Sequence, residues 1–254
     1  PPRGFYFLDK GGFALYHKIL LKLSGEAFSG IGERGFAPQR LQYLVDELKK
    51  VIDMGASLGI VVGGGNHFRG SELKELHPLY ADQIGMLGTV INALYLKSAL
   101  DRQGIRSVVY SNIVELPGVY PIRYDSLHQN IESGVVALFG GGTSNPLFTT
   151  DSAAALRAVE MGADLLIKAT KVDGIYSRDP KIHPDAKRYD RLSFSEAIRL
   201  NLTVMDIGAF SICQRNGIPI HVLDFFQADN LLKAVLEEHI GTLVCPDSLK
   251  PTRL

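Results

Sequence analysis

The chain alternates short apolar runs with longer segments in which apolar residues recur at helical spacing. Apolar runs of about strand length occupy residues 15–23, 58–62, 107–110, 135–139, 164–168, 218–223 and 241–244. Helical spacing or helix start and stop signals mark residues 38–55, 81–102, 152–161, 193–196, 206–216 and 230–238. Strands that alternate with helices predict an α/β fold with a mainly parallel sheet and helices on both faces.

The longest predicted helix spans residues 81–102. Its expected inner face consists of Ile84, Leu87, Ile91 and Leu94, which recur at helical spacing. Asp82 lies in the first turn, where a carboxylate favours the helix dipole without any further role.

Residues 134–161 carry the most informative pattern in the chain. An apolar run ends in three consecutive glycines at 140–142, which suit a turn where backbone comes close to a ligand. A polar loop follows, and Thr149-Thr150-Asp151 then precedes an alanine-rich helix, as an N-cap would. Backbone N–H groups and the positive end of a helix dipole would meet here, which predicts an anion-binding site. A glycine-rich connection without a ligand is the alternative.

A second glycine turn, at 63–65, follows the apolar run 59–62. Parallel strands place such turns at one edge of the sheet, where ligands of α/β proteins bind. One phosphate site would need only one such turn, so the presence of two turns favours a site for a donor phosphate and a second site for an acceptor. Lys22 ends the first predicted strand and is followed by Ser24-Gly25, as in a phosphate-binding turn, although a lysine there is more often only a solvated charge.

Residues 30–35 match the pattern G-x-G-x-x-G, yet six residues separate them from the preceding strand. A dinucleotide-binding turn has no such gap. This pattern therefore favours a mobile loop over a dinucleotide site.

Composition narrows the functional classes. The 254 residues are enough for one large domain or two small ones, and 27 basic against 27 acidic residues argue against a nucleic-acid-binding surface. No apolar run is long enough to span a membrane, and Asp9 and Lys10 interrupt any signal peptide at the start. Cys213 and Cys245 are far apart in sequence, which predicts neither a disulfide framework nor a zinc cluster and favours the cytoplasm.

Phosphoryl transfer is the chemistry that these residues suit best, because it depends on positioning and positive charge more than on a nucleophile. Lys22 and Arg69 can supply the charge, and Asp151 could orient a lysine or help to hold a magnesium ion. The sequence contains no Walker A motif, no protein-kinase motifs and no G-x-S-x-G nucleophile elbow.

Three motifs resemble the amino acid kinase family: residues 22–25, residues 62–66 together with Arg69, and residues 171–176. Residues 143–154 look like the uridylate (UMP) kinase branch of that family, with Ser144 in place of the usual glycine and Leu147 in place of the usual phenylalanine. The resemblance runs from about residue 17 to residue 244, and residues 1–14 form an unassigned extension.

The resemblance implies a three-layer α/β/α sandwich with a roughly eight-stranded, mainly parallel central sheet. It implies one domain over residues 15–254, with the acceptor side in about 15–160 and the ATP side in about 161–254. It further implies ATP:UMP phosphotransfer in pyrimidine biosynthesis with Mg²⁺, a homohexamer, activation by GTP and inhibition by UTP.

The resemblance also assigns residues. The catalytic residues would be Lys22, Arg69 and Asp151. ATP would contact Lys22, Leu23, Ser24, Gly25, Gly65, Arg69, Thr170, Tyr176 and Asp179. UMP would contact Gly64, Asp82, Thr143, Ser144, Asn145, Pro146, Leu147, Phe148, Thr149 and Thr150. GTP would bind at Gly30, Ile31, Gly32, Glu33, Arg34 and Gly35.

Two alternatives remain at this stage. One is another amino acid kinase that phosphorylates a carboxylate, with the same ATP loops and a different acceptor loop. The other is a non-catalytic nucleotide sensor of the same fold, against which the joint presence of Lys22, Arg69 and Asp151 speaks.

Overall fold

A computed structural model of the chain describes residues 7–8, 14–29, 33–68, 73–202 and 204–246. Within them, nine strands form the central sheet in the order β11-β13-β12-β8-β3-β4-β7-β5-β6. The strands are β3 (Lys18–Leu23), β4 (Ser57–Val62), β5 (Ser107–Tyr110), β6 (Val119–Tyr120), β7 (Val136–Phe139), β8 (Leu165–Thr170), β11 (Arg191–Ser193), β12 (Ile220–Asp224) and β13 (Thr242–Cys245). Neighbouring strands are parallel except for the pair β12–β13.

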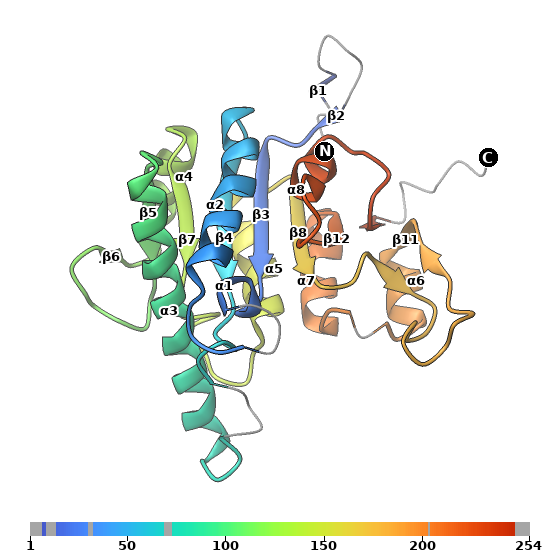
Figure 1. Cartoon of the computed structure of the whole chain (residues 1–254), viewed down its shortest axis with the longest axis horizontal. Coiled ribbons are helices and arrows are strands. Elements are labelled where there is room, and N and C mark those ends of the chain that lie inside the picture. The colour runs from blue at the N-terminus through green and yellow to red at the C-terminus, as the bar shows by residue number, and fades with distance from the viewer. Residues whose placement is uncertain (1–6, 9–13, 30–32, 69–72, 203, 247–254) are drawn as a thin grey trace.

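Helices cover both faces of this sheet, which confirms the predicted α/β/α sandwich (Figure 1). The helices are α1 (Glu26–Ser29), α2 (Pro38–Asp53), α3 (Pro78–Arg102), α4 (Tyr124–Glu132), α5 (Thr150–Met161), α6 (Phe194–Arg199), α7 (Ile207–Asn216) and α8 (Asn230–Val235). Apolar residues of α2, α3 and α8 share one buried cluster, and those of α4, α5, α6 and α7 share the other. None of the helices within the described residues is long and apolar enough to cross a bilayer.

Strand alternation decides which side chains reach each layer. In β3, Ile19 and Leu21 pack in the α2 cluster, whereas Leu20 packs in the α5 cluster. Because side chains alternate along a strand, Lys22 follows Leu20 onto the α5 face. The strands' carboxyl ends, where α1 lies and past which the first turns of α3 extend, form the lower edge of the sheet in Figure 1.

Several expected elements differ from the observed ones. The segment 114–125, which no sequence pattern assigned to a strand or helix, contains β6 and the start of α4. Two short antiparallel pairs also went unpredicted: β1 (Phe7–Leu8) with β2 (Ala14–Leu15), and β9 (Ile175–Tyr176) with β10 (Arg188–Tyr189). Elements of two or three residues carry too little periodicity to be recognised.

The expected inner face of α3 is wrong at two of its four residues. Leu94 packs against the buried cluster and Ile84 is half-buried, but Leu87 and Ile91 are exposed, by 46% and 45%. The buried residues of the helix are instead Gly88, Thr89, Val90, Asn92, Ala93, Leu96, Ala99 and Leu100. Between residues 85 and 92 the helix faces two glycine turns, and mainly small and polar residues point inward there.

Candidate active site

Two lysines on adjacent strands define the centre of the site. Lys22 of β3 and Lys168 of β8 are paired in register, so both side chains leave the sheet on the same face. Asp151, in the first turn of α5, lies between them. Its Oδ1 is 2.9 Å from Lys22 Nζ and its Oδ2 is 2.5 Å from Lys168 Nζ. Two ammonium groups thus share one carboxylate, which leaves a net positive charge for an anion.

The cluster is almost closed to solvent, with Lys22 and Lys168 each 9% exposed and Asp151 8% exposed. Burial alone would raise the pKa of Asp151, but the nearby charges of Lys22 and Lys168 hold that pKa below its ordinary value. Burial lowers the pKa of Lys168, and repulsion from Lys22 adds to this, while Asp151 opposes it. The Lys168 ammonium also donates to the carbonyl of Val204.

The start of α5 adds positive potential to the same place. Thr149 is its N-cap, and the Thr149 hydroxyl accepts hydrogen bonds from the backbone N–H groups of Asp151 and Ser152. Asp206, the N-cap of α7, accepts hydrogen bonds from the hydroxyls of Thr149 and Ser152. The two helices therefore begin side by side, and the position of Asp151 depends on both caps.

The first glycine turn packs directly on the turn that follows Lys22. A Cβ on Gly25 would lie 2.5 Å from the backbone nitrogen of Asn66, and one on Gly64 would lie 2.6 Å from the carbonyl oxygen of Gly85 in α3. Glycine is required at both positions by this close approach. The segment 24–25 and the turn 63–65 thus form one surface of backbone groups beside the lysines.

Buried amides hold this first turn in place. Asn66 and Asn92 are 1% and 0% exposed, and Asn92 Nδ2 donates to the carbonyl of Gly63 at 2.6 Å and to Asn66 Oδ1. Asn66 also exchanges two hydrogen bonds with Gly35: Asn66 Nδ2 donates to the Gly35 carbonyl, and the Gly35 N–H donates to the Asn66 carbonyl. Gly35, the last residue of the segment 30–35, is therefore hydrogen-bonded to Asn66, which follows the first glycine turn.

The second glycine turn leads into the loop expected to bind UMP. Asp82 of α3 accepts a hydrogen bond from the Leu147 N–H at 2.7 Å, so the structure brings these two predicted acceptor residues together. Thr143 Oγ1 bonds to the backbone of Asn145. Leu147 and Phe148 are exposed, by 72% and 62%.

Both departures from the usual acceptor motif have left-handed backbone. Ser144 has φ +73° and Leu147 has φ +70°. A side chain costs about 1 kcal/mol or more in this region, which explains why glycine is usual at the first of these positions.

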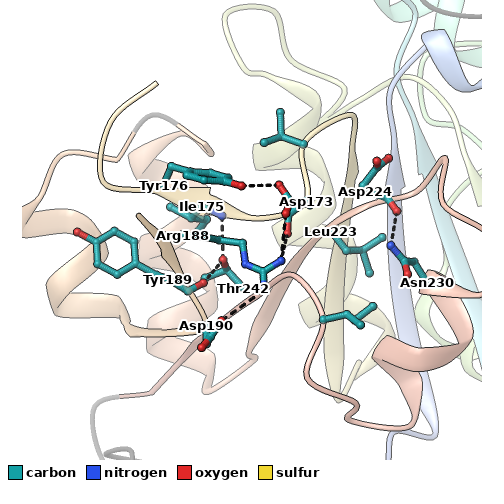
Figure 2. A network of polar contacts seen from close by, with 12 residues as sticks. Asp173, Ile175, Tyr176, Arg188, Tyr189, Asp190, Leu223, Asp224, Asn230 and Thr242 are labelled. Carbon is teal, nitrogen blue, oxygen red and sulfur yellow. Dashed lines mark hydrogen bonds and ion pairs between the residues drawn. The ribbon is translucent and has the colours of Figure 1, made fainter. Parts of the chain in front are cut away.

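A loop network shapes the expected ATP side (Figure 2). Asp173 accepts hydrogen bonds from the Tyr176 hydroxyl at 2.9 Å and from Arg188 at 3.1 Å. The bond to Asp173 raises the pKa of Tyr176. Gly174 has φ +153°, and a Cβ there would lie 2.6 Å from Thr242 Oγ1.

An open pocket of about 490 Å³ lies beside this network. Thr170, Tyr176 and Asp179 all line it, together with residues 200–202 and Val204. Its volume is within the range typical of small-molecule sites. Because Val204 also accepts a bond from Lys168, the pocket opens next to the lysine cluster.

Some predicted residues cannot be placed. Arg69 and residues 30–32 lie outside the described residues. Sequence reasoning missed Lys168 and Asp206. Lys168 could have been identified as a lysine at the end of an apolar strand, the pattern that indicated Lys22. Asp206 could have been identified as an acidic residue at the N-cap of a predicted helix.

Comparison with known proteins agrees with this geometry. The sequence profile of the amino acid kinase family matches residues 17–224. The chain belongs to the amino acid kinase family.

Within that family, the chain groups with the uridylate kinases. The uridylate kinase of Thermosipho melanesiensis is 57% identical over 232 residues, covering 91% of this chain and 100% of that protein. The uridylate kinase of Thermotoga maritima is 53% identical over 230 residues, with the same coverages, 91% and 100%. The crystal structure of UMP kinase from Bacillus anthracis superposes with a TM-score of 0.89 at 34% identity, covering 92% of this chain and 97% of that one.

Proposed function

We infer that this chain transfers the terminal phosphoryl group of ATP to UMP. The observation that carries this inference is the buried cluster of Lys22, Asp151 and Lys168 between two glycine turns. An oxygen of the UMP phosphate attacks the γ-phosphorus, the bond to the bridging oxygen breaks, and ADP and UDP are formed. The attacking oxygen is already anionic, so the reaction needs charge stabilisation and alignment rather than a general base.

The two lysines suit the charge of the transferring group. Asp151 pairs with both ammonium groups and holds them adjacent, and the dipole of α5 adds to the attraction. Gly65 and the segment 22–25 suit the donor phosphates, and Thr170, Tyr176 and Asp179 suit the rest of ATP. The acceptor nucleotide would contact Gly64, Asp82 and the loop 143–150.

The residues present fit a magnesium ion that arrives with ATP. Both oxygens of Asp151 face lysines, and no group of three His, Cys, Asp or Glu within the described residues could hold a metal ion. Mg²⁺ is commonly held by one or two carboxylates and substrate phosphates. With both of its oxygens on lysines, Asp151 would orient the lysines, the phosphates of ATP would supply most ligands of the ion, and bound Mg²⁺ would neutralise charge on those phosphates.

We extend the proposal to the whole molecule. Residues 161–254 would form the ATP side and residues 15–160 the acceptor side of one domain, because β8, β12, β13 and β11 lie on one side of β3 and β4, β7, β5 and β6 on the other. We also propose a cytoplasmic homohexamer that GTP activates at residues 30–35 and UTP inhibits. The bonds between Gly35 and Asn66 support a route from that segment to the donor turn.

A coupled assay tests the function directly. ATP is offered with UMP, CMP, aspartate or acetylglutamate, and turnover with UMP alone is expected. Turnover with a carboxylate would favour another amino acid kinase, and no turnover with any acceptor would favour a nucleotide sensor.

The role of the lysine cluster is tested by Lys22→Ala. Turnover with UMP is expected to fall by about 10²–10³, as for the loss of a group aimed at developing charge. The matched control is Lys49→Ala, which removes an exposed lysine paired with Asp53 on α2 and is expected to leave turnover unchanged. A Lys22→Ala enzyme within a few-fold of wild type, with its fold intact, would contradict the assignment.

A further inference from the structure

One face of α3 contacts both glycine turns and the acceptor loop. The face is formed by Asp82, Gly85, Thr89 and Asn92, whose spacing of three, four and three residues keeps them on one side of a helix. We call it the inner stripe of α3. Its members reach the N–H of Leu147, the turn at Gly64, the N–H of Gly141 and the carbonyl of Gly63.

Thr89 is the member that holds the second glycine turn. It is 2% exposed, and its Oγ1 accepts a hydrogen bond from the Gly141 N–H at 2.7 Å. The same hydroxyl donates to the Met86 carbonyl at 2.6 Å, which fixes the direction of its lone pairs. The turn also packs tightly on α3, because a Cβ on Gly140 would lie 2.9 Å from Cα of Val90.

Arg157 of α5 holds the same turn from the other side. It is 3% exposed, and its Nη2 donates to the Gly142 carbonyl at 3.2 Å. Its charge is balanced by an ion pair with Glu160, and its guanidinium carbon lies 6.0 Å from the centre of the Phe139 ring. Within the described residues the buried Nε of Arg157 has no hydrogen-bond partner, and an unsatisfied buried donor lowers the stability of the fold.

The backbone between these two contacts cannot hold itself in place by regular structure. Gly141 and Gly142 have φ +85° and +59°, a conformation in which glycine is free to move into several others. The hydrogen bonds from Thr89 of α3 and Arg157 of α5 hold the turn in one of these backbone conformations. The loop 143–150 begins directly after this turn, so its direction of entry is set here.

We propose that Thr89 and Arg157 are positioning residues for the acceptor nucleotide. They fix the turn 140–142 so that the loop 143–150 is ordered before UMP binds. This inference rests on the proposed function. In the described part of the chain, the hydrogen bonds of both side chains go to the turn 140–142 or to neighbours on their own helices, and neither residue lines the pocket of the ATP side. Substitution of either side chain is therefore expected to affect UMP binding and not ATP binding.

The test compares Thr89→Val with Thr89→Ser. Valine has the shape of threonine but leaves the Gly141 N–H without its acceptor, whereas serine keeps the hydroxyl. Thr89→Val is expected to raise the Michaelis constant for UMP by about tenfold, as one lost hydrogen bond to a buried group predicts. The constant for ATP should stay within about twofold, and Thr89→Ser should resemble wild type.

Binding of UMP without ATP, measured by calorimetry, gives a second readout and should weaken by the same factor. Equal increases in both Michaelis constants, or a valine variant that behaves like the serine variant, would overturn the inference. If Thr89→Val does not fold, the variant Arg157→Lys takes its place, because lysine keeps the charge but cannot reach both Gly142 and Glu160. Arg157→Lys is expected to raise the Michaelis constant for UMP and to leave that for ATP unchanged. A wild-type enzyme that does not phosphorylate UMP would instead refute the proposed function.

Discussion

The role of Lys168 in the reaction can be tested through the pH dependence of the activity. Burial and the neighbouring charge of Lys22 lower its pKa, so it loses its proton at a lower pH than an ordinary lysine does. A neutral Lys168 no longer attracts the transferring phosphoryl group. The value of kcat/KM for ATP, which reports groups of the free enzyme, is therefore expected to fall as the pH rises towards the ordinary lysine pKa.

Two substitutions of Lys168 test this expectation. Lys168→Met should lower kcat/KM by about 10²–10³ at neutral pH. Lys168→Arg keeps a charge that does not titrate below about pH 12, so its alkaline decline should disappear even where its turnover is reduced by the different geometry. An arginine variant with the wild-type alkaline decline would show that another group titrates.

The residues of the site differ in how far the sequence could reveal them. Lys22, Asp151 and the glycine turns follow local patterns: a strand end, a helix start and three glycines in a row. Lys168 belongs to the same cluster only because β8 lies beside β3 in register, although the two lysines are 146 positions apart in the chain. That pairing is a property of the sheet order, which no local pattern contains.

At the scale of elements, the start of α5 depends on the cap of α7. Asp206 accepts hydrogen bonds from Ser152 at 2.9 Å and from the Ala209 N–H at 2.7 Å, so one carboxylate caps α7 and fastens the first turn of α5. Asp151 lies in that turn. Loss of Asp206 should therefore change both stability and chemistry.

Asp206→Ala is expected to lower the free energy of unfolding by about 1–2 kcal/mol and to lower turnover as well. Ser193→Ala is the matched control. Ser193 caps α6 with a capping box that includes Glu196, so its loss should cost about 1 kcal/mol without a change in turnover. Denaturant titration and initial rates measure the two effects. Asp206→Ala with reduced stability and unchanged turnover would mean that its contacts with α5 have no influence on Asp151.

The α3 helix explains why element identity was easier to predict than element orientation. The apolar pattern correctly indicated a long helix, but it assigned Leu87 and Ile91 to the inner face. The inner stripe of α3 is offset from those residues by two positions, which is about 200° around a helix. Apolar periodicity locates apolar side chains and does not reveal what they contact. Here the neighbours are glycine turns, which leave room for threonine and asparagine.

At the scale of the whole molecule, the sheet accounts for the placement of the site. The neighbouring parallel strands β8, β3, β4 and β7 end at one edge, and each is followed by a segment that contributes to the cluster or to one of the turns. The outermost strands, β6 and β11, have only two and three residues. Short edge strands discourage pairing with another sheet, so we expect contacts between chains to involve helices.

The outer face of α3 is the surface that suits such a contact. Leu87 and Ile91 lie four residues apart on the helix, and each exposes nearly half of its surface. Apolar residues that adjoin one another on a surface helix mark an interface more often than isolated ones do. We expect the proposed homohexamer to bury this face, which would place two copies of α3 together and bring their inner stripes close to the same interface.

Leu87→Glu tests this arrangement, because a buried like-charge pair would oppose association of two copies. The variant is expected to elute as a smaller species than wild type in size-exclusion chromatography with light scattering, with its melting temperature lowered by loss of the contact. Met54→Glu is the control, since Met54 is 40% exposed at the end of α2 and has no place in the proposed interface. A wild-type protein that is monomeric at micromolar concentration, or a Leu87→Glu variant of unchanged mass, would contradict the use of this face. If the variant dissociates and its Michaelis constant for UMP rises while that for ATP does not, association acts on the acceptor loop through α3.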